Sequence, residues 1–451
     1  MNETPHTLPP LEAGTRALVL GLGRTGLSCA RYLRRKGLAV RVADTRAEPP
    51  GSGSLREQVP EAELRTGPFD ETLLEGVSQV VISPGLSLRE PVAAEAARRG
   101  LPVVGDIELF AREARAPVAA VTGTNGKSTV TALLAEVASA AGRPAIPGAN
   151  LGDPALDLLE RPVPALYVLE LSSFQLETTH SLCTETATVL NVTPDHLDRY
   201  DSLDEYAAAK ARIFDGCETA VVNADDARVR AMPRSGQRVL TFSLRDSSAD
   251  YSLTGGPEPR LACRGEPLLP LSALRLQGGH NAANALAALA MSEALDLPRA
   301  PVLEALARFG GLPHRAQWVA EVAGVRYVND SKGTNVGATV AAVEGTAGSL
   351  VVIAGGDGKN QAFDELRSAF RGKVRHVVLI GRDAPRLAAA LEGVCGIEHA
   401  PDMRAAVAAA HATARPGETV LLSPACASLD MYRDYAQRGE EFAAAVRSLA
   451  G

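Results

Sequence analysis

Val118–Thr129 reads Val-Ala-Ala-Val-Thr-Gly-Thr-Asn-Gly-Lys-Ser-Thr, and this stretch decides the fold. An apolar run enters a glycine-rich turn that ends in Gly-Lys-Ser-Thr, and the residues that follow have the composition of a helix. This order is typical of a P-loop, in which backbone N–H groups and a helix N-terminus hold phosphate oxygens. Lys127 would neutralise the β- and γ-phosphates, and the hydroxyl of Ser128 or Thr129 would face Mg²⁺. The general pattern has glycine where Val121 stands, and a tight strand–helix turn with an exposed lysine is the alternative interpretation.

The composition indicates a multidomain α/β protein. With 451 residues the chain is long enough for about three domains, each able to bury its own core. Aromatic residues make up only 4%, so the cores must be built from Ala, Val and Leu, which suits parallel sheets covered by helices. The formal net charge of −7 and the lack of a long basic run argue against nucleic acid as a partner.

Cysteine usage and hydropathy indicate a cytoplasmic protein. The six cysteines are scattered without Cys-x-x-Cys spacing, so we expect reduced thiols rather than disulfides or a zinc site. Residues 1–15 are polar and contain proline, without the apolar segment of a secretion signal. No apolar run approaches the length of a membrane span, so we expect no membrane insertion.

A second glycine-rich turn lies near the N-terminus. An apolar strand at 16–20 enters Gly21-x-Gly23-x-x-Gly26, a helical stretch follows, and a strand at 38–43 ends in Asp44-Thr45-Arg46. This strand–helix–strand order, with an acidic residue after the second strand, is that of Rossmann domains. A further strand at 77–82 runs into Ser83-Pro84-Gly85, a turn at a strand's carboxyl end. This unit alone suggests NAD or FAD, but three glycines do not distinguish a dinucleotide from another diphosphate, and a ligand-free turn that packs the helix on the strand is the alternative.

Candidate metal ligands follow the P-loop. Residues 147–152 are predicted to form a glycine-rich loop with one amide side chain, Asn150. A strand at 166–169 ends in Glu170, whose carboxylate is well placed to hold Mg²⁺ directly or through water. A solvated carboxylate at a strand end is the alternative for Glu170.

A dense polar loop follows the next predicted strand, 186–191. It contains Asp195-His196-Leu-Asp198-Arg199, in which His196 could bind a metal or make an ordinary hydrogen bond. Lys210 lies in the Ala-rich helical segment that comes next. Its ammonium group could reach water, or it could lose its charge and become chemically useful.

Two amide side chains open a long helix near residues 285–295. Asn281 and Asn284 are three residues apart and therefore lie on one helix face close to its N-terminus. They could recognise the edge of a nucleotide base, or they could only cap the helix. Residues 244–270, before this helix, are predicted to form short strands and turns.

The last third of the chain reads as another α/β unit, after a boundary near Gly310-Gly311-Leu312. Strands at 325–328, 350–354, 374–380 and 419–422 each run into a polar or glycine-rich loop, which indicates a parallel sheet with a functional carboxyl edge. The predicted fold is therefore three consecutive α/β domains: Rossmann-like at 1–105, central P-loop ATPase-type at 106–311, and Rossmann-like at 312–451. The phosphate cradle, the candidate Mg²⁺ ligands and the cations Arg315, Lys332 and Lys359 would suit a kinase, a GTPase-like switch or an ATP-driven ligase.

The motifs together resemble one family, the Mur ligases of peptidoglycan synthesis. They are Thr122-Gly-Thr-Asn-Gly-Lys-Ser-Thr129, Asn191-Val-Thr-Pro-Asp-His-Leu-Asp-Arg-Tyr200, His280-Asn281 and Asp330-Ser-Lys-Gly-Thr-Asn335. The members that add D-glutamate are most similar in three further motifs, Asp44-Thr-Arg46, Glu170-Leu-Ser-Ser-Phe-Gln-Leu-Glu177 and Ser423-Pro-Ala-Cys-Ala-Ser-Leu-Asp430. The resemblance runs in order over essentially the whole chain.

The resemblance implies an ATP-dependent amide ligase. Such an enzyme joins the amine of D-glutamate to the L-alanine carboxylate of UDP-N-acetylmuramoyl-L-alanine. The carboxylate first takes the γ-phosphate of ATP to give an acyl phosphate, which supplies the leaving group that a carboxylate lacks. Two Mg²⁺ ions would bridge phosphates and the developing charge.

The resemblance also implies site residues. For the UDP-substrate they are Thr25, Thr45, Arg46, Ser83, Gly85 and Asn150. For ATP they are Gly123, Thr124, Asn125, Gly126, Lys127, Ser128, Thr129, Asn281, Asn284, Arg315 and Asp330. For Mg²⁺ they are Ser128, Thr129, Glu170, His196 and a carbamylated Lys210, and for D-glutamate Lys332, Thr334, Ser428, Leu429 and Tyr435. Lys127, His196, Lys210 and Lys332 would act in catalysis, and the family pattern has Phe where Tyr435 stands.

Three other functions stay open at this stage. The chain could be a ligase for another amino acid, including a folylpolyglutamate synthetase, a dehydrogenase that uses the first glycine turn, or a non-catalytic nucleotide-binding protein. We expect a monomer in which ATP and substrate close the third domain over the middle one, about hinges near Asp106 and Gly311.

Overall fold

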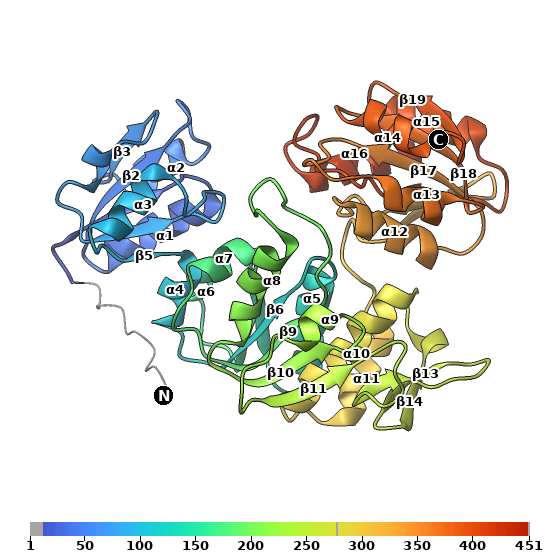
Figure 1. Cartoon of the computed structure of the whole chain (residues 1–451), viewed down its shortest axis with the longest axis horizontal. Coiled ribbons are helices and arrows are strands. Elements are labelled where there is room, and N and C mark those ends of the chain that lie inside the picture. Colours follow the sequence, from blue (N-terminus) through green and yellow to red (C-terminus); the bar gives the residue numbers. More distant parts are fainter. Residues whose placement is uncertain (1–11, 277, 450–451) are drawn as a thin grey trace.

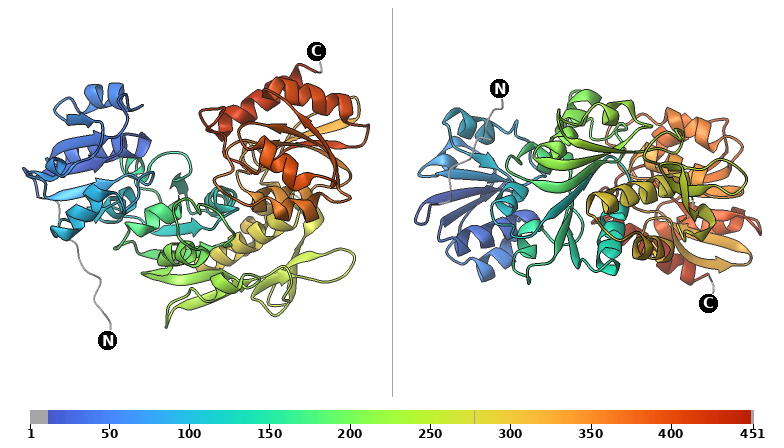
Figure 2. Two further views of the ribbon diagram at one scale, coloured as in Figure 1. Left: turned by 45° about the horizontal axis from the view of Figure 1, so that its top comes forward. Right: turned by 90° about the horizontal axis from the view of Figure 1, so that it is seen from below.

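The computed structural model describes residues 12–276 and 278–449 and organises them around three sheets that follow one another along the chain. We call residues 16–104, 106–308 and 317–447 the first, central and third bodies. The first and third bodies stand at the two ends of the central one, and the sheets lie in a row with helices on both sides (Figures 1 and 2). The predicted fold class, three consecutive α/β units, is confirmed, while the exact domain boundaries stay predictions.

The first body is a parallel sheet in the order β3-β2-β1-β4-β5. Its strands are β1 (Arg16–Leu20), β2 (Ala39–Asp44), β3 (Glu63–Thr66), β4 (Gln79–Ile82) and β5 (Val103–Val104), and its helices α1 (Arg24–Arg35), α2 (Ser52–Gln58) and α3 (Pro91–Arg98), with a 3₁₀ turn at Glu71–Leu74. The sequence predicted β1, β2 and β4 but not the short β3 and β5. The chain order reverses between β1 and β4, and open sheets bind ligands at such a point.

The central sheet has the order β14-β13-β12-β11-β10-β9-β6-β8-β7. Its strands are β6 (Val118–Thr122), β7 (Ala145–Ala149), β8 (Leu166–Glu170), β9 (Thr184–Val189), β10 (Cys217–Asn223), β11 (Arg238–Phe242), β12 (Tyr251–Leu253), β13 (Arg260–Cys263) and β14 (Glu266–Pro270). Its helices are α4 (Asp106–Ala111), α5 (Lys127–Ala140), α6 (Ala155–Leu158), α7 (Ser173–Glu177), α8 (Leu203–Ala211), α9 (Ala227–Arg230), α10 (Gly279–Ala294) and α11 (Arg299–Arg308), with 3₁₀ turns at Arg212–Phe214 and Leu271–Ala273.

One prediction for the central body was wrong. Residues 147–149 were predicted to be loop, but they form the second half of β7, which pairs in parallel with β8. β7 is an edge strand, and an edge tolerates Pro147 because one of its sides needs no hydrogen-bond partner. The predicted loop therefore begins only at Asn150.

The third sheet has the order β15-β16-β20-β17-β18-β19. Its strands are β15 (Gln317–Val322), β16 (Val325–Asn329), β17 (Leu350–Gly355), β18 (Val374–Ile380), β19 (Gly396–His399) and β20 (Thr419–Leu422), and its helices α12 (Val336–Gly345), α13 (Asp364–Phe370), α14 (Ala384–Leu391), α15 (Met403–Thr413) and α16 (Tyr435–Arg447). The prediction of a parallel sheet holds for β16 to β20. β15 was not predicted: Ala323 and Gly324 both have positive φ and form a tight hairpin that places β15 antiparallel to β16 at the edge of the sheet.

The hydrophobic cores join two of the bodies. One cluster of buried side chains runs without a break from the first body, for example Val42, into the central body at Phe110 and Tyr167. Arg31 and Arg35 of α1 also pair with Asp157 and Glu160 of the central body. The two core clusters of the third body contain only its own residues within the described ranges. The first and central bodies therefore form one packed unit, and the third body is attached mainly through polar contacts.

Candidate active site

The turn that is predicted to bind phosphate joins β6 to α5, and local contacts fix its backbone. Gly123 and Gly126 have φ of +149° and +84°, and a Cβ on Gly126 would lie 2.5 Å from Oδ1 of Asn284. The Asn191 side chain accepts the N–H of Asn125 at 2.8 Å and donates to its carbonyl at 3.2 Å. The backbone conformation thus favours glycine at both positions. The Asn191 side chain pairs with the N–H and the carbonyl of one residue, as the backbone of a neighbouring strand does.

Lys127 lies folded over this turn. Its Nζ donates to the carbonyls of Gly123 and Thr124 at 2.8 and 2.7 Å. Burial lowers the pKa of Lys127, while the carboxylates of Glu170 and Asp195 oppose that shift. The lysine is therefore held where phosphate oxygens could replace the two carbonyls as its partners.

Glu170 is buried at the end of β8, beside the first turn of α5. It accepts hydrogen bonds from Ser128 Oγ and from Asn150 Nδ2, the latter at 2.6 Å. Burial opposes ionisation of Glu170, but Lys127 and Arg315 hold its pKa below the usual range. A charged carboxylate next to a hydroxyl offers the oxygen ligands that Mg²⁺ prefers. Thr129, the other candidate, instead lines a neighbouring pocket between the central and third bodies.

The polar loop after β9 brings His196 and Asp195 to the same place. His196 has φ of +54°, and burial lowers its pKa to about 4 in spite of Asp195, so its ring is neutral near pH 7. Asp195 bonds Nζ of Lys359 at 2.8 Å and Nδ2 of Asn335 at 3.2 Å, both from the third body. Burial opposes ionisation of Asp195, but Lys359 brings its pKa down to about 2.

Lys210 is fully buried on α8 and reaches the phosphate-binding turn. Its Nζ donates to the carbonyl of Gly123 at 2.9 Å and lies 4.4 Å from the centre of the Tyr206 ring. Within the described residues it forms no ion pair, and burial together with the charge of Lys127 lowers its pKa well below the ordinary value. The amine is thus poised to be uncharged, which rules out the alternative that it reaches water.

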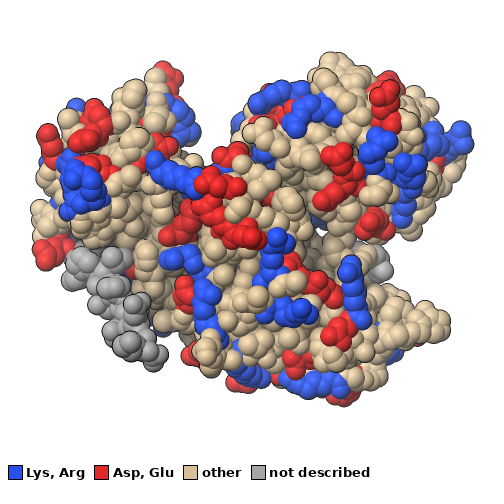
Figure 3. Space-filling model, in the orientation of Figure 1, with Lys and Arg blue, Asp and Glu red and all other residues tan. Residues whose placement is uncertain are grey.

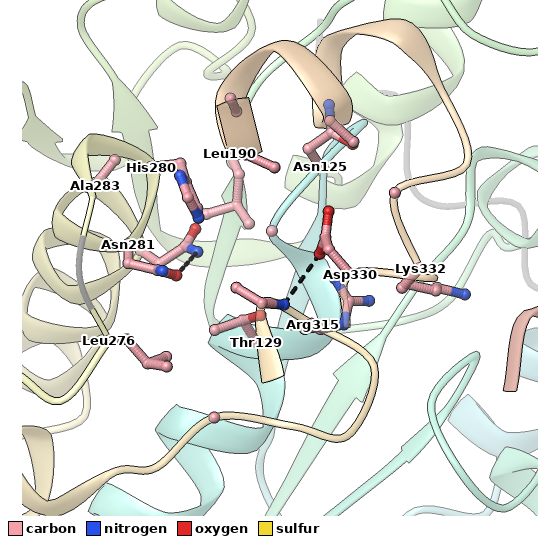
Figure 4. Close-up of a pocket in the computed structure, with 18 of the residues that line it drawn as sticks. Asn125, Thr129, Leu190, Leu276, His280, Asn281, Ala283, Arg315, Asp330 and Lys332 are labelled. Atoms are coloured by element: carbon pink, nitrogen blue, oxygen red, sulfur yellow. Dashed lines mark hydrogen bonds between the residues drawn. The ribbon is translucent and has the colours of Figure 1, made fainter. Parts of the chain in front are cut away.

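A pocket of about 140 Å³ lies between the central and third bodies (Figure 4). His280 and Asn281 approach it from α10, and Arg315 and Asp330 from the opposite side. Nδ2 of Asn284 is 3.4 Å from Oδ1 of Asn281, so the two amides do share one face. The pocket opens at the glycine-rich turn between β6 and α5, so its residues could hold a base beside the predicted phosphate site.

Asp330 and Lys332 follow β16 and have shifted pKa values. Asp330 accepts hydrogen bonds from Ser423 Oγ at 2.9 Å and from the N–H of Ala316 at 3.1 Å, and burial raises its pKa to about 6. Burial, reinforced by Arg315, lowers the pKa of Lys332 to about 8. Nζ of Lys332 lies 3.8 Å from the centre of the Tyr435 ring.

The other residues predicted to bind D-glutamate differ in how far they are buried. Thr334 lines the same cleft as Lys332, and Ser428 is buried in the loop after β20. Leu429 next to it is 71% exposed to solvent. Lys332 and Thr334 thus line one cleft and Lys332 contacts the Tyr435 ring, whereas most of Leu429 is exposed to solvent.

A second pocket, of about 460 Å³, opens at the glycine turn of the first body. The six residues predicted for the UDP-substrate all line it: Thr25, Thr45, Arg46, Ser83, Gly85 and Asn150. Asp44, the acidic residue of the Rossmann pattern, bonds Arg46 through both oxygens and accepts the N–H of Leu22 at 2.7 Å. The Arg46 guanidinium lowers the pKa of Asp44 to about 2, overcoming the opposing effect of burial. The Asp44–Arg46 ion pair therefore lies at the edge of this pocket, close to the point where the strand order of the sheet reverses.

A third pocket, of about 400 Å³, lies between all three bodies, in the hollow that the space-filling view shows (Figure 3). Gly85 of the first body, Lys127, Glu170 and Lys210 of the central body, and Lys332 of the third body line it. The cleft connects the phosphate-binding turn, the candidate UDP-substrate pocket and the cations of the third body. A phosphorylated carboxylate and an amine could meet there.

Several residues of the cleft were absent from the predicted site. Among them, Asp195 of the central body contacts Asn335 and Lys359 of the third body. Asp195 and Asn335 were part of the quoted motifs, and Lys359 was noted as a cation after β17. Each lies in a loop at a strand's carboxyl end, which was the available signal. Their mutual contact joins segments that are 140 to 164 residues apart and could be seen only in the folded chain.

Three general features complete the description. Within the described ranges no group of three or more His, Cys, Asp or Glu side chains is arranged to hold a metal ion. None of the helices in those ranges has both the length and the apolar character needed to cross a bilayer. All six cysteines are free.

The sequence matches known families along most of its length. Residues 15–105 match the Mur ligase MurD-like N-terminal domain, residues 121–292 the Mur ligase middle domain, and residues 314–426 the glutamate ligase domain of Mur ligases. Among curated relatives, the UDP-N-acetylmuramoylalanine–D-glutamate ligase of Nitrosococcus oceani is 52% identical over 98% of both chains. The protein of the same name from Aromatoleum aromaticum is 51% identical, over 97% of this chain and 98% of its own.

Solved structures share the fold at low identity. MurF ligase from Thermotoga maritima, in complex with ADP, has a TM-score of 0.63 and 16% identity over 97% of this chain and 96% of its own. UDP-N-acetylmuramate–alanine ligase MurC from Thermotoga maritima has a TM-score of 0.62 and 19% identity over 96% and 99%. With relatives about half identical over nearly the full length, the chain belongs to the Mur ligase family.

Proposed function

We propose that the chain is an ATP-dependent ligase that adds D-glutamate to UDP-N-acetylmuramoyl-L-alanine during assembly of peptidoglycan precursors. The observation that carries this proposal is the cleft between the three bodies. It joins the pocket beside the phosphate-binding turn to the pocket of the first glycine turn, and Lys332 and Lys359 of the third body line the cleft itself. The names of the relatives support D-glutamate as the amino acid.

The reaction uses these pockets in sequence. The L-alanine carboxylate attacks the γ-phosphorus of ATP. The bond between this phosphorus and the oxygen that stays with ADP breaks, and an acyl phosphate forms. The amine of D-glutamate then attacks the acyl carbon, a tetrahedral intermediate collapses, and inorganic phosphate leaves with the amide formed. Lys127 neutralises the transferring phosphate, and Lys332 balances the charge that develops on the acyl phosphate oxygens.

Two Mg²⁺ ions, when bound, would supply further neutralisation of the phosphate charge. Ser128, Glu170 and His196 have the oxygen and neutral nitrogen atoms that such ions need, and these atoms border the phosphate-binding turn. Lys210 would contribute if its uncharged amine added CO₂, forming an N–C bond and releasing a proton. The resulting carbamate would turn a buried cation into an oxygen ligand.

The other predicted contacts belong to this proposal. Asn281, Asn284, Arg315 and Asp330 would hold the base, phosphates and ribose of ATP. The residues of the second pocket would hold UDP, and Asn150, which also bonds Glu170, would reach the sugar side. Lys332, Thr334, Ser428 and Tyr435 would receive D-glutamate. We expect a monomer, and the free thiols support a cytoplasmic location.

The test is phosphate release from ATP in the presence of Mg²⁺ and UDP-N-acetylmuramoyl-L-alanine. We expect release to depend on D-glutamate, with L-glutamate and D-aspartate inert at the same concentration. Stimulation by another amino acid would reassign the third-body pocket. Release that needs no acceptor would leave only a nucleotide-hydrolysing activity and would overturn the proposal.

A further inference from the structure

Arg199 extends from the central body into the first and has no role in the proposed chemistry. It stands three residues after His196 in the loop that follows β9, and its side chain is 13% exposed. Its Nη1 donates to the carbonyl of Pro84 at 2.8 Å, and its Nη2 donates to the carbonyl of Leu86 at 2.6 Å. These carbonyls flank Gly85, in the turn that lines the candidate UDP-substrate pocket.

The same guanidinium packs against the reaction centre. Its Cζ lies 4.0 Å from the centre of the Phe174 ring, over the ring face. Phe174 in turn meets the His196 ring edge-to-face, with 4.9 Å between the ring centres. Arg199 therefore touches the substrate turn with its nitrogens and, through one aromatic ring, the imidazole in the cleft.

The turn that Arg199 holds is itself fixed to the glycine loop. Ser83 Oγ donates to the carbonyl of Gly21 at 3.1 Å, and the N–H of Leu86 donates to the carbonyl of Ser83 at 2.9 Å. A shift of residues 83–86 would therefore carry the floor of the UDP-substrate pocket with it. Two main-chain carbonyls at this spacing match the planar fork of a guanidinium, which an ammonium group cannot reproduce.

We propose that Arg199 is a positioning residue that fixes the distance between the UDP-substrate pocket and the reaction centre. Its hydrogen bonds hold the 83–86 turn in place. Its packing against Phe174 positions that ring and, through it, the His196 ring. The long substrate must reach from the first body to the cleft, so an error in this distance misplaces its reacting carboxylate. Misplacement by an ångström at a reaction centre costs about a hundredfold in rate. This inference rests on the proposed ligase function.

The test compares R199M and R199K with the unchanged enzyme in the D-glutamate-dependent assay. R199M loses the two hydrogen bonds to the carbonyls of Pro84 and Leu86 and the ion pair with Glu177 at 3.4 Å. We expect this loss to raise the KM for UDP-N-acetylmuramoyl-L-alanine and to lower kcat, each about tenfold or more. The KM for ATP should stay within about threefold, because the nucleotide pocket does not touch Arg199. R199K should recover only part of the loss, since lysine keeps the charge but not the fork.

Arg89 offers a matched control at the same interface. It crosses in the opposite direction, from the first body to Asp201 and Glu205 at 2.8 and 2.9 Å, and touches neither Phe174 nor the 83–86 carbonyls. R89M should leave all three constants within about twofold, because exposed ion pairs contribute little. Added methylguanidinium should restore part of the activity of R199A and none to R89A.

Several outcomes would overturn the inference. The first is that kcat and KM are unchanged in R199M. The second is that R89M loses as much activity as R199M does. The third is that R199M is impaired in every constant, including the KM for ATP, with a lowered melting temperature, while methylguanidinium does not rescue R199A. The last pattern would mean a purely structural role. If the unchanged enzyme itself shows no D-glutamate-dependent turnover, the proposed function fails, and that result is separate from any effect of the variants.

Discussion

Single residues in this protein are tuned by burial. Lys210 and Asp106 are both removed from water, and in each case burial is the largest cause of the pKa shift. Lys210 is moved toward the neutral amine and Asp106 toward the neutral acid, as expected when desolvation penalises the charged form. Lys210 lies at the cleft, whereas Asp106 lies at the junction of the first and central bodies, so their shifts have different consequences.

At Lys210 we expect activity to depend on dissolved CO₂. Prolonged dialysis against CO₂-depleted buffer should lower kcat about tenfold, as expected for loss of a metal-ligand oxygen, and bicarbonate should restore it. K210R, which keeps a cation but cannot form the carbamate, should be inactive with or without bicarbonate. Full activity after exhaustive CO₂ removal would show that Lys210 acts unmodified.

At Asp106 we expect a pH-dependent cost to stability. Burial raises its pKa from 3.8 to about 6, and Nε2 of Gln175 is its hydrogen-bond partner at 3.0 Å. Because the folded pKa lies above the unfolded one, the stabilising contribution is present below pH 3.8 and is lost as the pH rises through 6. The amide that D106N places at this position cannot ionise. Between about pH 4 and 7, the free energy of unfolding of the original protein should therefore fall by about 2–3 kcal/mol relative to that of D106N.

Urea unfolding at several pH values would measure this difference. Glu108, two residues along the same helix, is the control, because backbone N–H groups of His180 and Ser181 hold its pKa below the usual value against the effect of burial. The original protein should gain stability relative to E108Q as the pH rises through the acid range. An equal pH profile for the original protein and D106N would disprove the assigned burial cost.

Among the elements, the turn between β6 and α5 shows the clearest link from backbone to function. Gly126 needs a positive φ and also leaves room for Asn284. Gly142, which follows α5, has nearly the same φ of +86°, but a Cβ at this position would meet nothing within 4 Å. Alanine substitutions at these two glycines therefore distinguish the effect of backbone strain, which both share, from the effect of a steric clash, which only Gly126 has.

G126A and G142A are expected to differ in nucleotide binding. Both should lose about 1 kcal/mol of unfolding free energy from a left-handed backbone that alanine disfavours. Only G126A should also weaken ATP binding, with a KM raised about tenfold or more, because its methyl group displaces Asn284 from the base pocket. Steady-state kinetics with varied ATP would measure this. An equal effect of the two variants on the KM for ATP would contradict the role given to Asn284.

At the scale of the whole molecule, the third body is the part expected to move. The first and central bodies share a continuous core, whereas Lys359, Asn335 and Arg315 connect the third body through polar contacts to Asp195, Asn125 and Ser128. Polar contacts of this kind exchange partners more easily than a packed core. Closure would bring Lys332 nearer the acyl phosphate and exclude water from it.

Small-angle scattering would test this movement. The radius of gyration should fall when a non-hydrolysable ATP analogue and UDP-N-acetylmuramoyl-L-alanine are both present, and should fall less with either ligand alone. K359A, which removes the ion pair with Asp195, should start from a more extended average shape. An unchanged radius with both ligands would argue against closure as a step of the reaction.

The sequence by itself determined the local geometry of this protein and its family. The two glycine-rich turns, the strands that precede them and the ends at which Glu170 and Asp330 stand follow from short-range patterns of apolar residues and glycine. Tertiary structure alone decided the rest. It placed β15 antiparallel and β7 at an edge, paired Asp195 with Lys359, and carried Arg199 across to the 83–86 turn. The last two contacts join residues more than a hundred positions apart, and no local pattern encodes them because their energies arise only when the bodies pack together.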